Sequence, residues 1–313
     1  MLAYQAPAIL FNKHLETIYP ALLRSVKNVS YNRERITTPD NDFLDLDWLK
    51  GGSKKLIIIS HGLEGNSTRA YVQGMARIFF NQQYDVLAWN YRGCSGEVNK
   101  QVRFYHSGAT DDLHVVIQHA IAQHYEQIHL IGFSLGGNLT LKYLGEQRAG
   151  LPHQIKESVV FSVPLHLHTS CMNIETSARG IYATRFLRTL KQKVADKARL
   201  MPQIDVQHID QINTLQDFDD AYTARLHGFA NAIDYYEKCS SLYFLNDITR
   251  PTLLVNAQND PFLSSRCYPV LADHKFLKTE YPKRGGHVGF AQFNKNGVYW
   301  SELRALQFIQ AGT

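Results

Sequence analysis

The segment Gly132-Phe133-Ser134-Leu135-Gly136 contains residue types whose spacing is suited to covalent chemistry. It matches the G-x-S-x-G pattern, in which a serine nucleophile occupies a sharp turn between a strand and a helix. Glycine is needed two residues to either side, because the neighbouring backbone comes so close that a side chain would clash. An apolar stretch precedes Ser134 and a helix-forming stretch follows it. The simpler alternative is that Ser134 only caps that helix.

Serine becomes a strong nucleophile when a histidine accepts its proton and a carboxylate holds that histidine. In this architecture the three residues follow in the chain order serine, acid, histidine. Asp260 comes after the apolar segment PTLLVNA, and His287 lies in the glycine-rich segment KRGGHVGF before the last predicted helix. Both positions lie just beyond the ends of predicted strands. We therefore predict Ser134, Asp260 and His287 as a catalytic triad.

The tetrahedral intermediate of acyl transfer carries an oxyanion that needs hydrogen-bond donors. The backbone N–H of the residue after the nucleophile, Leu135, is the first expected donor. The second is expected in the loop after an early strand, where the segment SHGLEG places Leu63 after a His-Gly turn. We predict Leu63 and Leu135 as the oxyanion hole, and a structural role for His61 in holding the loop. This chemistry requires no cofactor and no metal.

A second pattern pairs His106 with Asp111, with four residues between them. This is the spacing of a glycerolipid-type acyltransferase site, but that chemistry uses a different fold. Asp111 also lies at the start of a predicted helix, where the helix dipole stabilises an acidic side chain. We therefore predict no catalytic role for this pair.

The elements that must position these residues follow an α/β pattern. Segments with helical periodicity alternate with short apolar runs, so we predict a mostly parallel central sheet with helices on both faces. Residues 29–50 predict a hairpin at one edge of the sheet, with its turn at the segment TPDND. The uninterrupted apolar runs, which are typical of strands buried on both faces, are 55–60, 84–90, 128–133, 157–163 and 251–257.

The alternation is interrupted over residues 165–248, where the chain is mostly helical and charged. An insertion between two strands of a finished sheet would lie over its carboxyl edge. We therefore expect a single domain over residues 1–313, with 165–248 as a mainly helical cap insertion. The apolar and aromatic residues of this insertion either line an acyl pocket or form ordinary helix packing, and both interpretations stay open. These residues include Ile181, Tyr182, Phe186, Leu187, Phe229 and Tyr236.

The composition argues against several other classes of protein. Hydrophobic residues make up 44% of the chain, which is enough for a substantial core. The net charge of +5 has no accompanying aromatic-and-basic motif, so no nucleic-acid partner is expected. Four widely spaced cysteines predict neither a zinc site nor a disulfide framework. Without a signal-peptide pattern or an apolar run of ~20 residues, a cytoplasmic protein in a reducing compartment is expected.

The densest basic segment, residues 185–199, has helical spacing and is typical of a solvated helix face. It is also compatible with weak association with an anionic membrane surface. Neither this segment nor any other determines the oligomeric state.

Taken together, the motifs resemble the α/β-hydrolase superfamily and, within it, the YheT-like hydrolases (AB-hydrolase type 4). The resemblance covers nearly the whole length and implies serine hydrolase activity on carboxylic esters, with the triad at Ser134, Asp260 and His287. It rests on the segments FNKHLETIYPALLR, SHGLEGNSTRAYV, NYRGCSGEVN, RFYHSGATDDL, IGFSLGGN, FDDAYTARLHGFANAIDYYEKCSS, PTLLVNAQNDPF and GGHVGF.

We therefore expect a serine esterase that cleaves small-molecule carboxylic esters of short to medium acyl chain length through an acyl-enzyme intermediate. Two alternatives stay open. One is an acyltransferase with the same triad, in which an alcohol other than water takes the acyl group. The other is a non-catalytic binding protein that keeps the fold.

Overall fold

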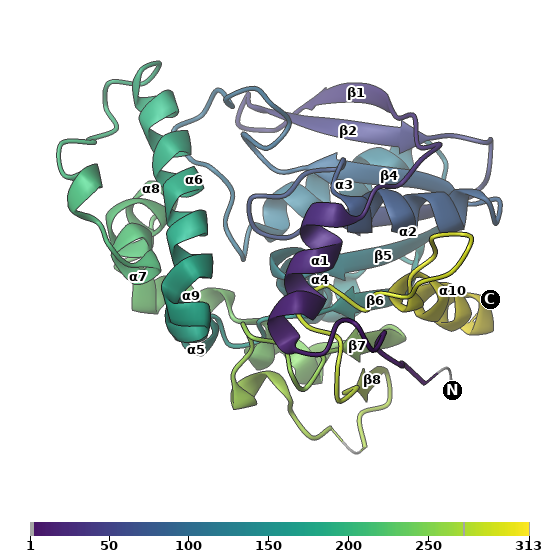
Figure 1. The fold of residues 1–313 in the computed structure, drawn as a ribbon. Coiled ribbons are helices and arrows are strands. Elements are labelled where there is room, and N and C mark those ends of the chain that lie inside the picture. The colour runs from purple at the N-terminus through teal and green to yellow at the C-terminus, as the bar shows by residue number, and fades with distance from the viewer. Residues whose placement is uncertain (1–2, 272, 313) are drawn as a thin grey trace.

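The computed structural model describes residues 3–271 and 273–312 (Figure 1). Their strands form an eight-stranded sheet in the order β1-β2-β4-β3-β5-β6-β7-β8. Strand β2 pairs antiparallel with β1 and with β4, and all other neighbours are parallel. The strands are β1 (Asn32–Thr37), β2 (Phe43–Leu49), β3 (Lys55–Ser60), β4 (Asp85–Asn90), β5 (Gln127–Phe133), β6 (Ile155–Phe161), β7 (Thr252–Val255) and β8 (Leu277–Glu280).

Helices alternate with strands over much of the chain, and a group of helices separates β6 from β7. The mostly parallel sheet with helices on both faces, which the apolar runs predict, is confirmed. The α-helices are α1 (Lys13–Leu23), α2 (Ala70–Phe80), α3 (Thr110–Ala122), α4 (Leu135–Gln147), α5 (Leu167–Thr176), α6 (Ile181–Ala198), α7 (Leu215–Phe218), α8 (Arg225–His227), α9 (Ala232–Cys239) and α10 (Trp300–Gly312).

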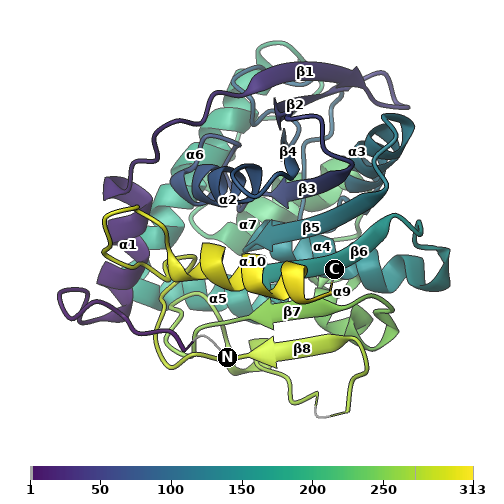
Figure 2. The ribbon, with the colours of Figure 1, turned by 90° about the vertical axis from the view of Figure 1, so that its right-hand side faces the viewer.

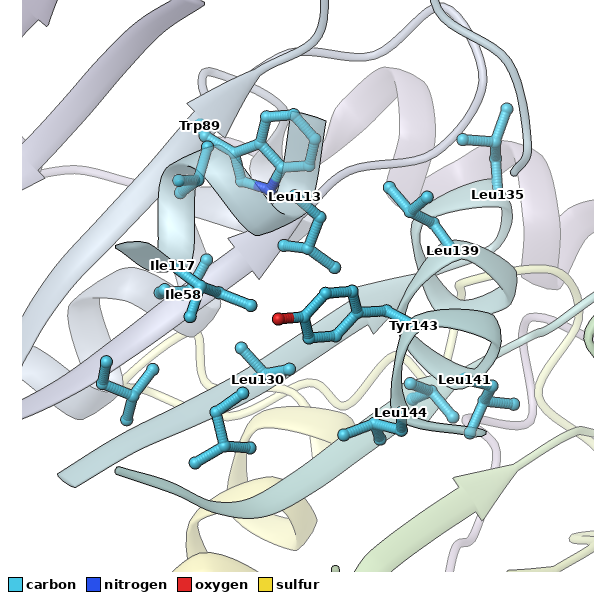
Figure 3. Close-up of a cluster of buried hydrophobic side chains, with 14 of the residues drawn as sticks. Ile58, Trp89, Leu113, Ile117, Leu130, Leu135, Leu139, Leu141, Tyr143 and Leu144 are labelled. Atoms are coloured by element: carbon cyan, nitrogen blue, oxygen red, sulfur yellow. The ribbon is translucent and has the colours of Figure 1, made fainter. Parts of the chain in front are cut away.

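Two hydrophobic cores cover the two faces of the sheet, because successive side chains of a strand point to opposite faces. In β3, Ile57 and Ile59 belong to the core that includes residues of α2 and α10. Ile58 belongs to the core formed with α3 and α4, part of which Figure 3 shows around Tyr143. Figure 2 shows α2 and α10 on one face of the sheet.

The predicted hairpin is confirmed as β1 and β2, with Thr38 and Asp42 at the ends of its turn. The Thr38 N–H donates a hydrogen bond of 3.0 Å to the Asp42 carbonyl. Asn41 has a φ of 59° in this turn, a conformation that asparagine tolerates well. Two predicted strand ends are wrong, since β6 ends at Phe161 rather than at residue 163 and β7 ends at Val255 rather than at residue 257. Ser162 takes a φ of 53° and so leaves the extended conformation.

The segment between β6 and β7 carries helices α5 to α9 and, among its described residues, no strand. These helices have a hydrophobic core of their own, which includes Leu187, Val194, Phe218 and Tyr235. Figure 1 shows them grouped at one side of the sheet. We keep residues 165–248 as the proposed bounds of the cap.

The basic segment of α6 is only partly a solvated face. Arg185 and Arg188 are exposed, but Lys197 is buried. The Lys197 ammonium donates to the Asn99 side-chain oxygen at 2.7 Å and to the Arg103 carbonyl at 2.8 Å. Burial lowers the pKa of Lys197 to about 7. Within residues 3–271 and 273–312, no helix has the length and apolar character needed to cross a membrane.

Candidate active site

Ser134 occupies the sharp turn between β5 and α4. Its φ of 52° and ψ of −118° lie outside the regions that non-glycine residues favour. A Cβ atom at Gly132 would lie 2.5 Å from the Gly136 carbonyl oxygen. A Cβ atom at Gly136 would lie 2.3 Å from the Ser60 carbonyl oxygen. Both glycines are therefore required by close backbone approach.

The side chain of Ser134 is not used as a helix cap. Ser134 stands at the N-cap position of α4, but its side chain makes no cap hydrogen bond. Its backbone is held instead: the Ser134 N–H donates to the Phe161 carbonyl at 2.9 Å, and the Asn138 N–H donates to the Ser134 carbonyl at 3.0 Å. The hydroxyl group is left available for another partner.

That partner is His287, and the structure brings the three predicted residues together. His287 Nε2 lies 2.9 Å from Ser134 Oγ. His287 Nδ1 lies 2.8 Å from Asp260 Oδ2 and 3.1 Å from Oδ1. Because an ionised carboxylate only accepts hydrogen bonds, Nδ1 carries the hydrogen and Nε2 is left free to accept one from the serine.

The histidine loop is fixed by hydrogen bonds to its backbone. The His287 N–H donates to Thr17 Oγ1 at 2.9 Å, and the Val288 N–H donates to Ser162 Oγ at 2.8 Å. Val288 has a φ of 54°, which is strained for a β-branched residue. These contacts fix the histidine loop against α1 and the end of β6.

Asp260 is held just beyond β7. Its side chain is fully buried, and its Oδ1 accepts the Phe262 N–H at 2.9 Å. The ring of Phe262 lies against the imidazole of His287, with centroids 4.2 Å apart. Phe262 therefore fixes the plane of the histidine ring and excludes water from one side of it.

The predicted oxyanion donors are the backbone N–H groups of Leu63 and Leu135. A Cβ atom at Gly62 would be 3.3 Å from the Ser134 Cβ, so the loop that carries Leu63 contacts the nucleophile turn. The Gly62 N–H is already used by the Tyr71 hydroxyl at 2.9 Å. Among residues 3–271 and 273–312, neither the Leu63 N–H nor the Leu135 N–H donates to a protein acceptor.

His61 has the surroundings of a structural histidine. Its Nε2 accepts the Tyr91 N–H at 3.3 Å, and its Nδ1 lies 2.8 Å from the Gly62 carbonyl oxygen. Burial lowers the pKa of His61 to about 3, so the ring is neutral at physiological pH. It can then satisfy both neighbours, with the hydrogen on Nδ1.

A cavity of about 530 Å³ reaches Ser134 and His287 and extends beneath the cap. Beneath the cap its lining includes the apolar residues Leu167, Ile174 and Phe218, together with the polar residues Asp219 and Thr223. The exposed residues of its lining mark the opening: Ile18 and Ala21 on α1, Arg69 before α2 and Arg185 on α6.

The six cap residues for which two interpretations stood open fall into three groups. Tyr182, Phe186 and Tyr236 line the cavity. Leu187 and Phe229 do not line it, and both pack in the core of the cap instead. Ile181 is exposed.

The His106 and Asp111 pattern does not form a second site. Asp111 is paired with Arg103 at 2.6 Å, while His106 packs against the ring of His227 with centroids 4.6 Å apart. Burial lowers the pKa of His106 well below its ordinary value. In the part of the chain that the structure describes, no group of three or more His, Cys, Asp or Glu side chains could hold a metal ion.

Sequence reasoning missed several residues that contact the loops of Asp260 and His287. Glu16 on α1 accepts the Gly285 N–H at 2.9 Å and an Asn259 side-chain N–H at 2.7 Å, so it contacts the loops that carry Asp260 and His287. Thr17 and Phe262 contact His287. In the sequence, these residues stand out only because they lie inside the segments FNKHLETIYPALLR and PTLLVNAQNDPF. That position does not indicate what their side chains contact.

Comparisons with known proteins show the family to which the chain belongs. The family model described as serine aminopeptidase, S33 matches residues 51–274. The chain is 32% identical to "Putative esterase YheT" of Escherichia coli (strain K12), over 89% of this chain and 84% of that protein. It is 28% identical to "Phospholipase ABHD3" of Bos taurus, over 95% of this chain and 75% of that protein.

Solved structures share the fold at lower sequence similarity. The esterase Pf2001 of Pyrococcus furiosus superposes with a TM-score of 0.58, at 16% identity, over 92% of this chain and 96% of that one. The fold and the resemblance that the sequence motifs indicate are thus confirmed. The chain belongs to the α/β-hydrolase family described as serine aminopeptidase, S33, and within it to the YheT-like hydrolases.

Proposed function

We propose that this protein is a serine hydrolase that cleaves carboxylic esters through an acyl-enzyme intermediate. The observation that supports it most directly is the continuous hydrogen-bonded line from Ser134 Oγ through His287 to Asp260, with separations of 2.9 and 2.8 Å. These separations are within the reach that proton transfer between nucleophile and base requires. The relatives named as an esterase and a phospholipase support the same ester chemistry.

In the first half of the reaction, Ser134 Oγ attacks the ester carbonyl carbon while His287 Nε2 takes the hydroxyl proton. The buried Asp260 carboxylate stabilises the imidazolium that forms. The Leu63 and Leu135 N–H groups donate to the oxyanion of the tetrahedral intermediate. The intermediate collapses when His287 gives the proton to the alkoxide, so that the alcohol leaves and the acyl group stays on Ser134.

In the second half, water takes the place of the alcohol. His287 Nε2 accepts a proton from the water as its oxygen attacks the acyl carbon. The same N–H donors stabilise the second oxyanion. Collapse of this intermediate breaks the bond to Ser134, which regains the proton, and the carboxylic acid is released.

The cavity supports an apolar acyl group of short to medium length. Its volume of about 530 Å³ is within the range of sites that hold small organic ligands. Its inner wall beneath the cap is lined by apolar residues such as Leu167 and Phe218, whereas its open end carries Arg69 and Arg185. We assign the inner end to the acyl chain and the open end to the alcohol part of the ester.

The open end also supports a weak association with an anionic membrane surface. Ile18 lines the opening, and Leu22, one turn further along α1, has 60% of its surface exposed. Across the opening, Ile181 at the start of α6 is 65% exposed, one turn before Arg185. Exposed apolar side chains combined with positive charge are typical of segments that bind anionic lipid.

The test is hydrolysis of p-nitrophenyl esters from acetate to palmitate by the wild-type protein and by Ser134→Ala. Ser53→Ala, a change at the opposite end of the sheet before β3, is the control. We expect Ser134→Ala to abolish turnover while its thermal unfolding stays unchanged, and Ser53→Ala to keep full activity. The acyl chain length that is hydrolysed most efficiently indicates the length of the acyl pocket.

A fluorophosphonate probe tests the serine independently of the substrate. Only an activated serine reacts, so wild-type protein should be labelled at Ser134 and the alanine variant should not. Absence of labelling in folded wild-type protein would contradict the proposal and favour a binding protein. Labelling without ester hydrolysis, but with transfer to added alcohols, would identify an acyltransferase instead.

A further inference from the structure

The loop that carries Leu63 is a tight turn with an unfavourable residue in it. The Gly65 N–H donates to the Gly62 carbonyl at 3.0 Å, which makes Leu63 and Glu64 the two central residues. Glu64 has a φ of 52°. Turns with positive φ at this position strongly favour glycine there, so a glutamate is strained. Such strain persists where surrounding contacts hold the residue in place.

Those contacts involve every polar group of Glu64. The Tyr105 hydroxyl accepts the Glu64 N–H at 2.9 Å and donates to its carboxylate at 2.7 Å. Arg69 donates to the Glu64 carbonyl oxygen at 2.7 Å. Lys193 donates to the carboxylate at 2.6 Å. The glutamate side chain thus supplies two of the contacts that fix the turn, which explains why a glycine does not stand here.

Lys193 is the partner that comes from the cap. It lies on α6, while Glu64 and Tyr105 belong to loops of the sheet domain. The side chains of Lys193 and Glu64 are only 18% and 12% exposed, so solvent screens the pair weakly. Burial alone would lower the pKa of Lys193, but the nearby Cys94 and Glu64 raise it above its ordinary value. The lysine therefore stays charged.

We propose that Lys193 is a positioning residue for the oxyanion hole: through Glu64, it fixes the turn that directs the Leu63 N–H toward the carbonyl oxygen of an ester bound at Ser134. This inference rests on the proposed function. The oxyanion hole is then complete only when the cap is packed against the sheet domain, because displacement of α6 removes the Lys193 ammonium from Glu64. Catalysis is then coupled to cap position without any contact between Lys193 and the reacting atoms.

The test compares Lys193→Met, Lys193→Arg and the control Lys191→Met. Lys191 lies on the same helix, does not line the cavity and donates to the Asp210 carbonyl at 3.3 Å. Loss of a single oxyanion donor lowers kcat by roughly 10²–10³ in other serine hydrolases. For Lys193→Met, where the donor is displaced rather than lost, we expect kcat on a short soluble ester to fall at least about tenfold. KM should stay within about twofold, because ground-state binding does not use the hole.

A fourth variant separates positioning from stability. The double variant Glu64→Gly with Lys193→Met removes the strained residue together with the ammonium that would otherwise be left unpaired, so thermal stability should be kept or raised, while kcat should fall as in Lys193→Met. Lys193→Arg should restore most of kcat, and Lys191→Met should match the wild type. A purely structural ion pair would instead lower the unfolding temperature and leave kcat unchanged.

The outcomes distinguish the two proposals. If wild-type protein hydrolyses esters and Lys193→Met keeps the same kcat, the positioning role is wrong and the proposed function stands. If wild-type protein shows neither turnover nor fluorophosphonate labelling of Ser134, the proposed function is wrong and this inference fails with it.

Discussion

The buried carboxylate of Glu16 accepts a hydrogen bond of 2.7 Å from the side-chain amide of Asn259, although the two residues lie 243 positions apart. The same carboxylate accepts the Gly285 N–H and pairs with Arg284. Asn259 precedes Asp260, and Gly285 lies two residues before His287. One side chain on α1 therefore fixes the relative positions of the acid loop and the histidine loop.

Replacement of this carboxylate should affect stability and catalysis together. Glu16→Gln keeps the shape but turns one acceptor oxygen into a donor that faces N–H groups. Since a lost hydrogen bond to a charged group is worth about 1.5–3 kcal/mol, we expect the free energy of unfolding to fall by about that amount. The kcat should fall as well, because the distance between Asp260 and His287 is no longer fixed.

Urea unfolding and ester hydrolysis of the same preparation would measure both effects. Glu126→Gln, at an exposed position, is the control and should change stability by less than about 0.5 kcal/mol. A Glu16→Gln protein with normal stability and normal kcat would show that α1 is not needed to hold the two loops.

The proposed catalytic residues could be predicted from the sequence because each lies in the turn or loop that follows a strand. Ser134, Asp260 and His287 stand just beyond β5, β7 and β8, and the carboxyl ends of parallel strands meet at one edge of the sheet. Chain order and local pattern were therefore sufficient to bring the three residues together. In the structure, Ser134 Oγ lies 2.9 Å from His287 Nε2, and His287 Nδ1 lies 2.8 Å from Asp260 Oδ2.

The supporting residues could not be predicted, because their partners lie far away along the chain. No local pattern connects Glu16 on α1 with Asn259 or Gly285. For α6, the charge pattern predicts a solvated face, yet Lys193 and Lys197 point inward. The acceptors for these two lysines are supplied by loops around residues 64 and 99–103, which helical periodicity cannot indicate.

The turn at Ser134 predicts that Gly132 and Gly150 differ sharply in how well they tolerate replacement by alanine. In Gly132→Ala, the new Cβ would lie 2.5 Å from the Gly136 carbonyl oxygen and 2.7 Å from the Gly137 Cα. The backbone must shift, so we expect a loss of about 1–3 kcal/mol in stability together with loss of activity. At Gly150, which ends the short helix after α4, a Cβ meets nothing within 4 Å.

Gly150→Ala is therefore the matched control, and it should leave unfolding and turnover unchanged. Thermal unfolding, soluble expression and ester hydrolysis of both variants measure the difference. Normal stability of Gly132→Ala would mean that the Gly136 carbonyl oxygen does not approach Gly132 closely at this turn.

Asp219 predicts a pH dependence of stability in the cap. Burial raises the pKa of Asp219 from its ordinary value of 3.8 to about 6, against the opposing hydrogen bonds from Thr223 and Tyr236. A carboxyl group with a raised folded-state pKa stabilises the fold below pH 3.8. That contribution is lost as the pH rises through about 6. Above this range the ionised group costs stability.

Asp219→Asn keeps the shape and removes the charge. We expect it to raise the free energy of unfolding at pH 8 by about 1–2 kcal/mol, and the gain to vanish near pH 4, where the wild-type carboxyl is protonated. Asp217→Asn, two residues away and exposed, should show neither effect. Urea unfolding at the two pH values is the measurement, and a gain that is equal at both would refute titration of Asp219 in this range.

The cavity opening predicts where the protein meets lipid. Leu22 on α1 and Ile181 on α6 are 60% and 65% exposed beside an opening that also carries Arg69 and Arg185. Replacing both apolar residues by aspartate removes buried apolar area at the lipid surface and adds charge that anionic lipid repels. We expect Leu22→Asp with Ile181→Asp to lower co-sedimentation with phosphatidylglycerol-containing vesicles at least about tenfold, because each lost contact is worth on the order of 1 kcal/mol.

Val270→Asp is the control, since Val270 is 90% exposed and does not line the cavity. All variants should hydrolyse a short soluble ester at the wild-type rate. Equal loss of binding in the control, or none in the double variant, would show that this face does not meet the membrane.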